Sequence, residues 1–187
     1  MEYPNDKDLA QKLLNPTTRR EAFGMVVNQY SEMLYWKIRH IVLFHEDAND
    51  VLQNTLMKAW NAIGSFRGDS QLATWLCRIA INESLDFTRH KQALTILSSD
   101  STTDSSGIAL HERLMADEYF DGDKTEAMLQ EAISRLPDVQ KTVFLLRYYD
   151  EMKYSDISKM LNTSEGALKA SYHIAVNKIK DFFKSND

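Results

Sequence analysis

Four polar residues near the end of the chain, Ser164, Glu165, Lys169 and His173, have the chemistry needed to contact base pairs. A glutamate carboxylate accepts a hydrogen bond from the amino group of cytosine, and a lysine ammonium donates to guanine or to a phosphate. Glu165, Lys169 and His173 recur every four residues, so a helix would carry them along one face. This pattern favours hydrogen bonding to the edges of DNA bases.

Two short helices must position these side chains. Apolar residues at 154, 157, 160 and 161 predict a first helix, which the polar residues 162–164 interrupt. Thr163 or Ser164 can cap a second helix, whose apolar stripe runs from Leu168 to Ile179. The pair predicts a helix-turn-helix, in which the N-terminal residues of the second helix meet base edges in the major groove. Short amphipathic helix pairs also occur in all-helical proteins of other kinds.

A second polar row lies in the first half of the chain. It consists of Arg78, Asn82, Asp86 and Arg89, on one face of a helix whose apolar stripe starts at Leu72. Arginine and asparagine hydrogen-bond to base edges or to phosphates. Any surface helix shows polar residues at this spacing, so the row taken alone favours a solvated helix face over a DNA contact.

Apolar stripes over 23–34 and 48–63 predict two further helices before that one. The glycine-containing polar stretch 64–70 separates them from it. Because Trp60 and Trp75 both lie on apolar stripes, we predict that both pack in the core and do not stack on bases.

Catalytic chemistry is not favoured by the sequence. The five histidines lack the spacing of metal ligands, and no glycine-rich phosphate loop is present. Asp47 and Asp50 stand three residues apart without a basic or nucleophilic neighbour, and two carboxylates alone make a weak cation site. Cys77, the single cysteine, falls in a helical pattern and is interpreted as a packed apolar residue. We expect a protein that is not an enzyme and that holds no metal and no cofactor.

The net charge of -5 is concentrated in one segment. Residues 1–93 carry 11 basic and 11 acidic side chains, residues 94–126 carry 2 and 8, and residues 127–187 carry 9 and 8. The polar run 98–107 has too little apolar surface to pack. Near-neutral domains neutralise few phosphates, which indicates that a partner supplies part of the affinity for DNA.

The sequence therefore predicts an all-α chain with two small helical domains, 1–93 and 125–187, joined by a flexible acidic linker at 94–124. No apolar run approaches the ~18 residues that span a bilayer, and the N-terminus lacks the basic start and apolar stretch of a signal peptide. We expect a cytoplasmic protein with no direct membrane insertion.

Both halves of the chain resemble the extracytoplasmic-function (ECF) sigma factors of bacterial RNA polymerase, a group of the sigma-70 family. The similarity to their domain 2 lies in residues 47–60, 66–68, 74–76, 79–82, Asp86 and Arg89. Residues 136–183 resemble their domain 4. The two domains occur in the right order with a variable linker between them, which makes the resemblance specific.

The resemblance implies a transcription initiation factor that binds core RNA polymerase, directs it to promoters and helps to melt the DNA. It assigns the polymerase contact to Asp47, Asp50, Gln53 and Asn54. It assigns the -10 element, including a base flipped out of the duplex, to Phe66, Arg67, Gly68, Asp69, Ser70, Arg78, Asn82, Asp86 and Arg89. It assigns the -35 element to Ser164, Glu165, Lys169 and His173. It further implies an anti-sigma factor as a regulatory partner.

This chain departs from the family pattern at several positions. Asn54 stands where the family frequently has glutamate, and Leu72 where an aromatic residue is common. Ser171 and Ile174 replace two arginines of the recognition helix, so we expect fewer phosphate contacts. The alternative function is a freestanding helix-turn-helix regulator whose N-terminal helices dimerise or sense a ligand. Near-neutral domains and the lack of a heptad seam argue against it.

Overall fold

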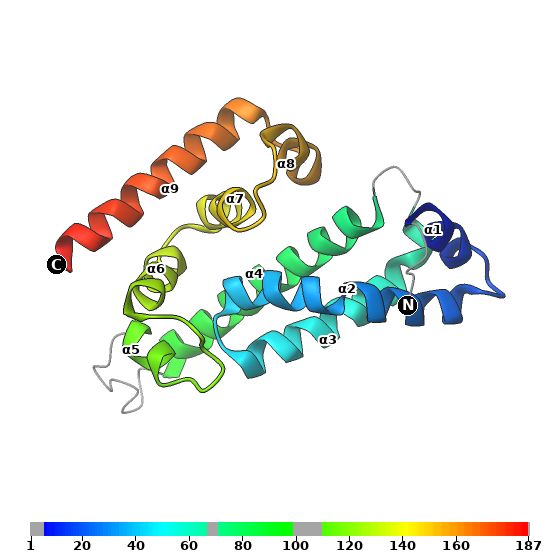
Figure 1. Ribbon diagram of the computed structural model, residues 1–187, viewed down its shortest axis with the longest axis horizontal. Helices are drawn as coiled ribbons and strands as arrows, with labels where there is room; N and C mark the ends of the chain where they lie inside the picture. Colours follow the sequence, from blue (N-terminus) through cyan, green and yellow to red (C-terminus); the bar gives the residue numbers. More distant parts are fainter. Residues whose placement is uncertain (1–5, 67–70, 99–109, 187) are drawn as a thin grey trace. The chain divides into compact units, whose positions relative to one another are not determined.

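The computed structural model describes residues 6–66, 71–98 and 110–186, and every regular element within them is helical (Figure 1). The all-α prediction is therefore confirmed. The contacts divide the chain into two compact units, Met1–Thr88 and Arg89–Asp187, and each is described by itself below. In the described ranges, no helix combines the length and the apolarity needed to cross a bilayer.

The first unit is built on a pair of long helices. Its elements are α1 (Asp6–Leu14), α2 (Arg19–Val42), α3 (His45–Ala62), the short 3-10 helix η1 (Ile63–Ser65) and the first part of α4 (Leu72–Ser98). Helices α2 and α3 pack side by side along their length (Figure 1). Leu43 ends α2 with a φ of 75°, and its N–H donates to the carbonyl of Arg39. This left-handed residue lets the chain reverse within two residues.

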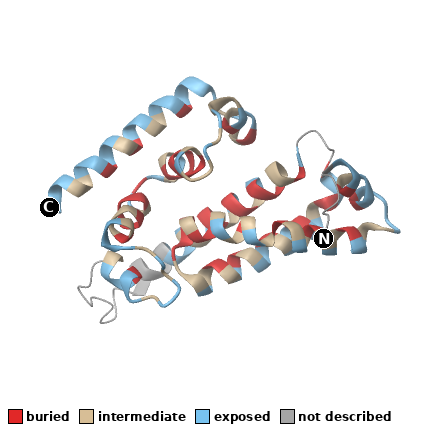
Figure 2. Cartoon of the chain, in the orientation of Figure 1, coloured by how far each residue is buried: buried red, intermediate tan, exposed pale blue. Residues whose placement is uncertain are grey.

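Apolar stripes form the core of the first unit, as the sequence predicts. On α2 the buried residues include Val26, Tyr30 and Leu34, and on α3 they include Ala48 and Val51 (Figure 2). An ion pair between Lys58 of α3 and Glu83 of α4 joins these two helices at the surface. The apolar stripes bury one face of each helix and leave the opposite face to solvent.

Trp60 and Trp75, both predicted to pack in the core, differ in how far they are buried. Trp75 is half-buried, and its ring lies 5.2 Å from that of Phe66, which is only 3% exposed. Trp60 is 39% exposed and makes an edge-to-face contact with Phe23 at 5.1 Å. The prediction of core packing is wrong for Trp60, because more than a third of its surface remains exposed to solvent.

The second unit contains the remaining helices. They are α5 (Leu110–Met115), α6 (Lys124–Ser134), α7 (Asp138–Tyr148), α8 (Tyr154–Leu161) and α9 (Glu165–Ser185). The long helix α9 packs against α6, α7 and α8. Its buried residues Leu168, Ala175 and Ile179 are the stripe that the sequence predicts.

Helical structure extends into both ends of the segment 94–124. Helix α4 continues to Ser98, and α5 packs on α6 with Leu114 only 1% exposed. A flexible linker over the whole segment is therefore too broad an expectation, since α5 has an apolar residue to bury. Most of the polar run 98–107 lies outside the described residues.

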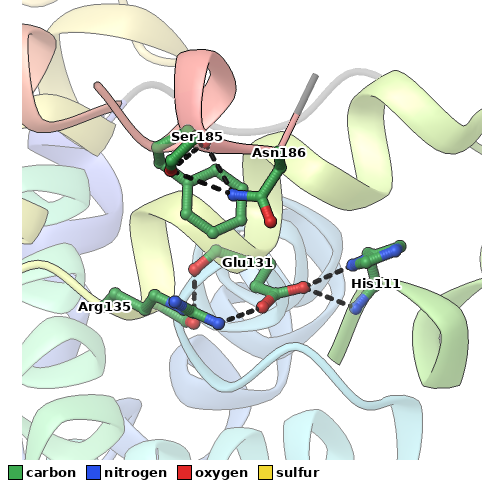
Figure 3. Close-up of polar contacts among 7 residues, drawn as sticks. His111, Glu131, Arg135, Ser185 and Asn186 are labelled. Atoms are coloured by element: carbon green, nitrogen blue, oxygen red, sulfur yellow. Dashed lines mark hydrogen bonds and ion pairs between the residues drawn. The ribbon is translucent and has the colours of Figure 1, made fainter. Parts of the chain in front are cut away.

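A buried carboxylate ties α5 to α6 (Figure 3). One oxygen of Glu131 lies 3.0 Å from the backbone N of His111 and 2.6 Å from its Nδ1, and the other accepts from Arg135 at 2.5 Å. Burial alone would raise the pKa of the Glu131 carboxyl, but the hydrogen bonds from His111 and Arg135 outweigh it and lower this pKa below its ordinary 4.5.

We expect Glu131→Gln to lower the free energy of unfolding of the second unit by about 2 kcal/mol at pH 7, because charge-assisted hydrogen bonds are replaced by weaker ones. A lowered pKa in the folded state contributes stability above the unfolded value and loses it as pH falls through the folded value. The difference between the proteins should therefore shrink on acidification below pH 4.5. Thermal denaturation of the full chain across pH checks this, with the exposed Glu118→Gln as control. A constant difference across pH would contradict the account.

We expect Phe66→Ala to destabilise the first unit by about 3 kcal/mol, since it removes a buried ring and leaves a cavity beside Trp75. The measurement is thermal unfolding followed by circular dichroism and by tryptophan fluorescence. An unchanged melting temperature would show that Phe66 does not hold the core together.

Candidate functional site

The turn between α8 and α9 sets where the recognition helix begins. Asn162 ends α8 in the left-handed region at φ 51° and ψ 47°, a conformation that asparagine tolerates better than most residues. The N–H of Thr163 donates to the carbonyl of Ser158 at 3.2 Å. The hydroxyl of Ser164 then accepts from the N–H of Ala167 at 3.3 Å and caps α9. Of the two capping candidates, Ser164 is the one that the structure uses.

The side chains proposed to contact the -35 element lie on one exposed face of α9. Glu165, Lys169 and His173 are all exposed, whereas Leu168 beneath them is 1% exposed (Figure 2). Lys169 Nζ lies 3.6 Å from Glu165 Oε2, and His173 Nε2 lies 3.1 Å from Asn177 Nδ2. The surface is thus a row of polar groups that pair weakly with one another and can exchange these contacts for DNA.

Two further residues lie at the edge of this row: Tyr154, which the sequence indicates only as part of an apolar stripe, and Arg147, which it does not single out. The Tyr154 ring centroid is 4.7 Å from Arg147 Cζ and 5.6 Å from Lys169 Nζ. Tyr154 belongs to the apolar stripe of α8, so periodicity assigns it to the core. It is half-buried, and its ring contacts both cations, which periodicity does not indicate.

The polar row on α4 is exposed along its length. Arg78, Asn82, Asp86 and Arg89 are all exposed, as expected for one helical face. Arg89, at the start of the second unit, donates from Nε to Asp138 Oδ2 at 2.7 Å within that unit. Its guanidinium must leave or share this ion pair before it can contact DNA.

The candidates around the predicted base pocket divide into two groups. Phe66 is buried against Trp75, so the prediction that it contacts the -10 element needs correction: in this conformation it has almost no surface to present to a base. The other four candidates of this stretch, Arg67, Gly68, Asp69 and Ser70, lie outside the described residues.

The predicted polymerase contact maps to one side of α3. Asp50, Gln53 and Asn54 are exposed and Asp47 is half-buried. Met57, which continues this side of the helix, is 64% exposed. The face therefore combines carboxylate, amide and apolar groups, a composition suited to another protein surface.

Within the described residues, no group of three or more histidine, cysteine, aspartate or glutamate side chains has the geometry to hold a metal ion.

The chain matches two regions of one protein family. The model of Sigma-70 region 2 matches residues 26–94, which contain the α3 and α4 candidates. The model of Sigma-70 region 4 matches residues 126–179, which contain the helix-turn-helix. Together the two regions cover most of the chain in the order that the sequence predicts.

Individual relatives agree with this assignment. The chain is 28% identical over 159 residues to the ECF RNA polymerase sigma factor SigW of Bacillus subtilis, covering 82% of this chain and 84% of that protein. Its fold is similar to CnrH, solved in complex with the cytosolic domain of CnrY, with a TM-score of 0.68, 20% identity and coverage of 97% and 99% of the two chains. It is also similar to RpoE of Bartonella quintana, solved with the anti-sigma factor NepR, with a TM-score of 0.63, 23% identity and coverage of 88% and 98%.

A freestanding regulator is not favoured by these findings. The chain carries two regions of one family in sequence order, and its relatives match along most of its length. The protein belongs to the sigma-70 family, in its group of ECF RNA polymerase sigma factors.

Proposed function

We propose a division of work between the two halves of this transcription initiation factor. Residues 1–93 bind core RNA polymerase and open the -10 element, and residues 125–187 read the -35 element. The observation that carries the proposal is the exposed row of Glu165, Lys169 and His173 at the start of a capped α9, in a chain that also matches region 2. The segment 94–124 joins the two halves.

The polymerase contact is assigned to the exposed side of α3. Ala48, Val51 and Thr55 are buried on its opposite side, which fixes the direction in which Asp50 and Gln53 point. Asp47 lies at the margin of this surface and Asn54 within it. The backbone of this face is already ordered in the helix, so binding through it costs little backbone entropy.

The -10 contact is assigned to the exposed row of α4. Arg78 and Asn82 supply donors for phosphates and base edges, and Asp86 and Arg89 continue the row. The flipped base is assigned to Arg67, Gly68, Asp69 and Ser70 from the family resemblance, and these residues lie outside the described part of the chain. Phe66 has a structural part in this proposal, since its buried ring packs against Trp75 near the start of α4.

The charge balance of the chain supports a factor that works in a complex. The residues 1–93 and 127–187 are close to neutral, so phosphate neutralisation by this protein alone is weak. Binding to polymerase supplies the missing affinity. The protein works in the cytoplasm, where its polymerase partner is found, transfers no chemical group and needs no cofactor.

An anti-sigma factor is the proposed regulator. CnrH and the Bartonella quintana RpoE were each solved with another protein bound, and that of RpoE is described as an anti-sigma factor. In this chain the mixed polar and apolar side of α3, with Met57 64% exposed, is the surface that such a partner would cover.

We expect Asp50→Lys to reduce binding to core RNA polymerase at least tenfold while the melting temperature is unchanged, because it reverses a charge on an exposed helix face. Fluorescence anisotropy of the labelled full chain, titrated with core polymerase, measures the affinity. The matched control is Asp8→Lys on α1, an exposed aspartate outside the assigned surface. Equal affinity of the Asp50 variant and the wild type would remove α3 from the interface.

We expect Lys169→Ala to weaken recognition of the -35 element by about 1–3 kcal/mol if the lysine contacts a base. Run-off transcription on a promoter with both elements should fall accordingly, and transcription from an extended -10 template without a -35 element should not. An equal fall on both templates would show that Lys169 acts elsewhere. The matched control is Lys178→Ala, an exposed lysine further along α9.

A further inference from the structure

The ring of Tyr154 lies within reach of two cations from two other helices. Arg147 of α7 has its Cζ 4.7 Å from the ring centroid, and Lys169 of α9 has its Nζ 5.6 Å from it. A cation within about 6 Å of an aromatic ring face is attracted by the ring quadrupole. One side chain of α8 thus connects the recognition helix to α7.

The position of the ring is fixed from the core of the unit. Tyr154 meets Tyr172 at a centroid distance of 6.5 Å and an interplanar angle of 78°. Tyr172 in turn stacks on Phe144 at 5.8 Å and 15°, and Phe144 is 4% exposed. The Tyr154 ring is therefore packed on the buried part of the unit through Tyr172.

Arg147 is held on the ring by its other contacts. Its Nη1 donates to the carbonyl of Met152, just before α8 begins. Its Nε is buried and has no hydrogen-bond partner among the described residues, so the aromatic face offsets part of the cost of burying that group. These contacts keep the guanidinium against Tyr154.

Lys169 has a contact on each of two sides. Its side chain is 60% exposed, with Glu165 one turn back on α9 at 3.6 Å and the Tyr154 ring across the turn at 5.6 Å. A free lysine loses much rotamer freedom when it contacts DNA, because it has four rotatable bonds. The ring and the carboxylate reduce that loss in advance, which is the effect of preorganisation.

We propose that Tyr154 is a positioning residue for -35 recognition, whose ring directs the ammonium of Lys169 toward the base pair or phosphate that it contacts. This inference rests on the proposed role of Lys169 at the -35 element. It adds that the specificity at the position contacted by Lys169 is set partly by α8, the helix before the recognition helix.

The first test observes the contact in the free protein. The full chain, labelled with ¹³C-lysine, is compared by NMR with Tyr154→Leu and Tyr154→Phe, and Lys169→Arg identifies the Lys169 signal. We expect an upfield ring-current shift of the Lys169 ε-methylene that disappears with leucine and remains with phenylalanine. A Lys169 signal that is unaffected by Tyr154→Leu would overturn the proposal.

The second test measures recognition by the holoenzyme. Core RNA polymerase with the full chain selects sequences from promoter fragments randomised over the -35 element. We expect Tyr154→Leu to reduce the base preference about two- to five-fold, corresponding to about 0.5–1 kcal/mol, at the positions where Lys169→Ala reduces it. Tyr154→Phe should restore the preference.

A double-mutant cycle separates positioning from general damage to the fold. If Tyr154 acts through Lys169, Tyr154→Leu adds no further loss in the Lys169→Ala protein. Losses that add fully would overturn the proposal, because Tyr154 would then act by another route. Tyr148→Leu is the matched control, since Tyr148 is 51% exposed in the same unit and stacks on Phe144.

The wild-type selection separates a failure of this inference from a failure of the proposed -35 recognition on which it rests. A wild-type holoenzyme that selects no -35 sequence would overturn both the role of α9 and the role of Tyr154. A wild-type holoenzyme that selects a clear -35 sequence, together with an unchanged preference in Tyr154→Leu, would overturn only the positioning role.

Discussion

Burial of one apolar stripe of α9 is the constraint on which the candidate -35 surface depends. Leu168, Ala175 and Ile179 pack against the neighbouring helices, and a helix with this face buried must present Glu165 and Lys169 to solvent. The left-handed turn and the Ser164 cap fix the residue at which that helix begins. A one-residue shift of the sequence along this helix would turn every side chain by about 100° around the helix axis and take Leu168 out of its buried position.

The same one-sided burial produces the two candidate surfaces of the first unit. Val51 and Thr55 pack inward on α3, which leaves Asp50 and Gln53 outside, and Leu76 and Ala80 on α4 leave Arg78 and Asn82 outside. The partner surfaces are therefore what remains when each helix buries its apolar stripe. The buried faces stabilise the fold and the proposed partner surfaces lie opposite them, so we expect substitutions on the exposed faces to change binding without unfolding the chain.

Periodicity in the sequence predicts most of the buried and exposed helix faces, because helices pack through residues three or four positions apart. It predicts the stripes, the exposed rows and the cap, since these depend on neighbours three or four residues away. It misplaces Trp60, which is 39% exposed, because periodicity indicates which side of a helix faces its neighbours but not how far they cover that side. The -10 role of Phe66 comes from the family resemblance, and it does not fit a ring that is 3% exposed. Periodicity cannot reveal the contact between His111 and Glu131 or the reach of Tyr154 to Lys169, since these pairs are far apart in sequence and meet only through tertiary packing.

The most direct measurement is run-off transcription with bacterial core RNA polymerase on fragmented genomic DNA, with and without the protein, followed by mapping of the new start sites. If both halves of the chain direct polymerase to promoters, the new starts are preceded by a shared pair of elements at -10 and -35. New starts that share only one element would contradict the assigned division of work. Sequence-specific binding of DNA by the protein alone, with no new starts, would contradict the account as a whole.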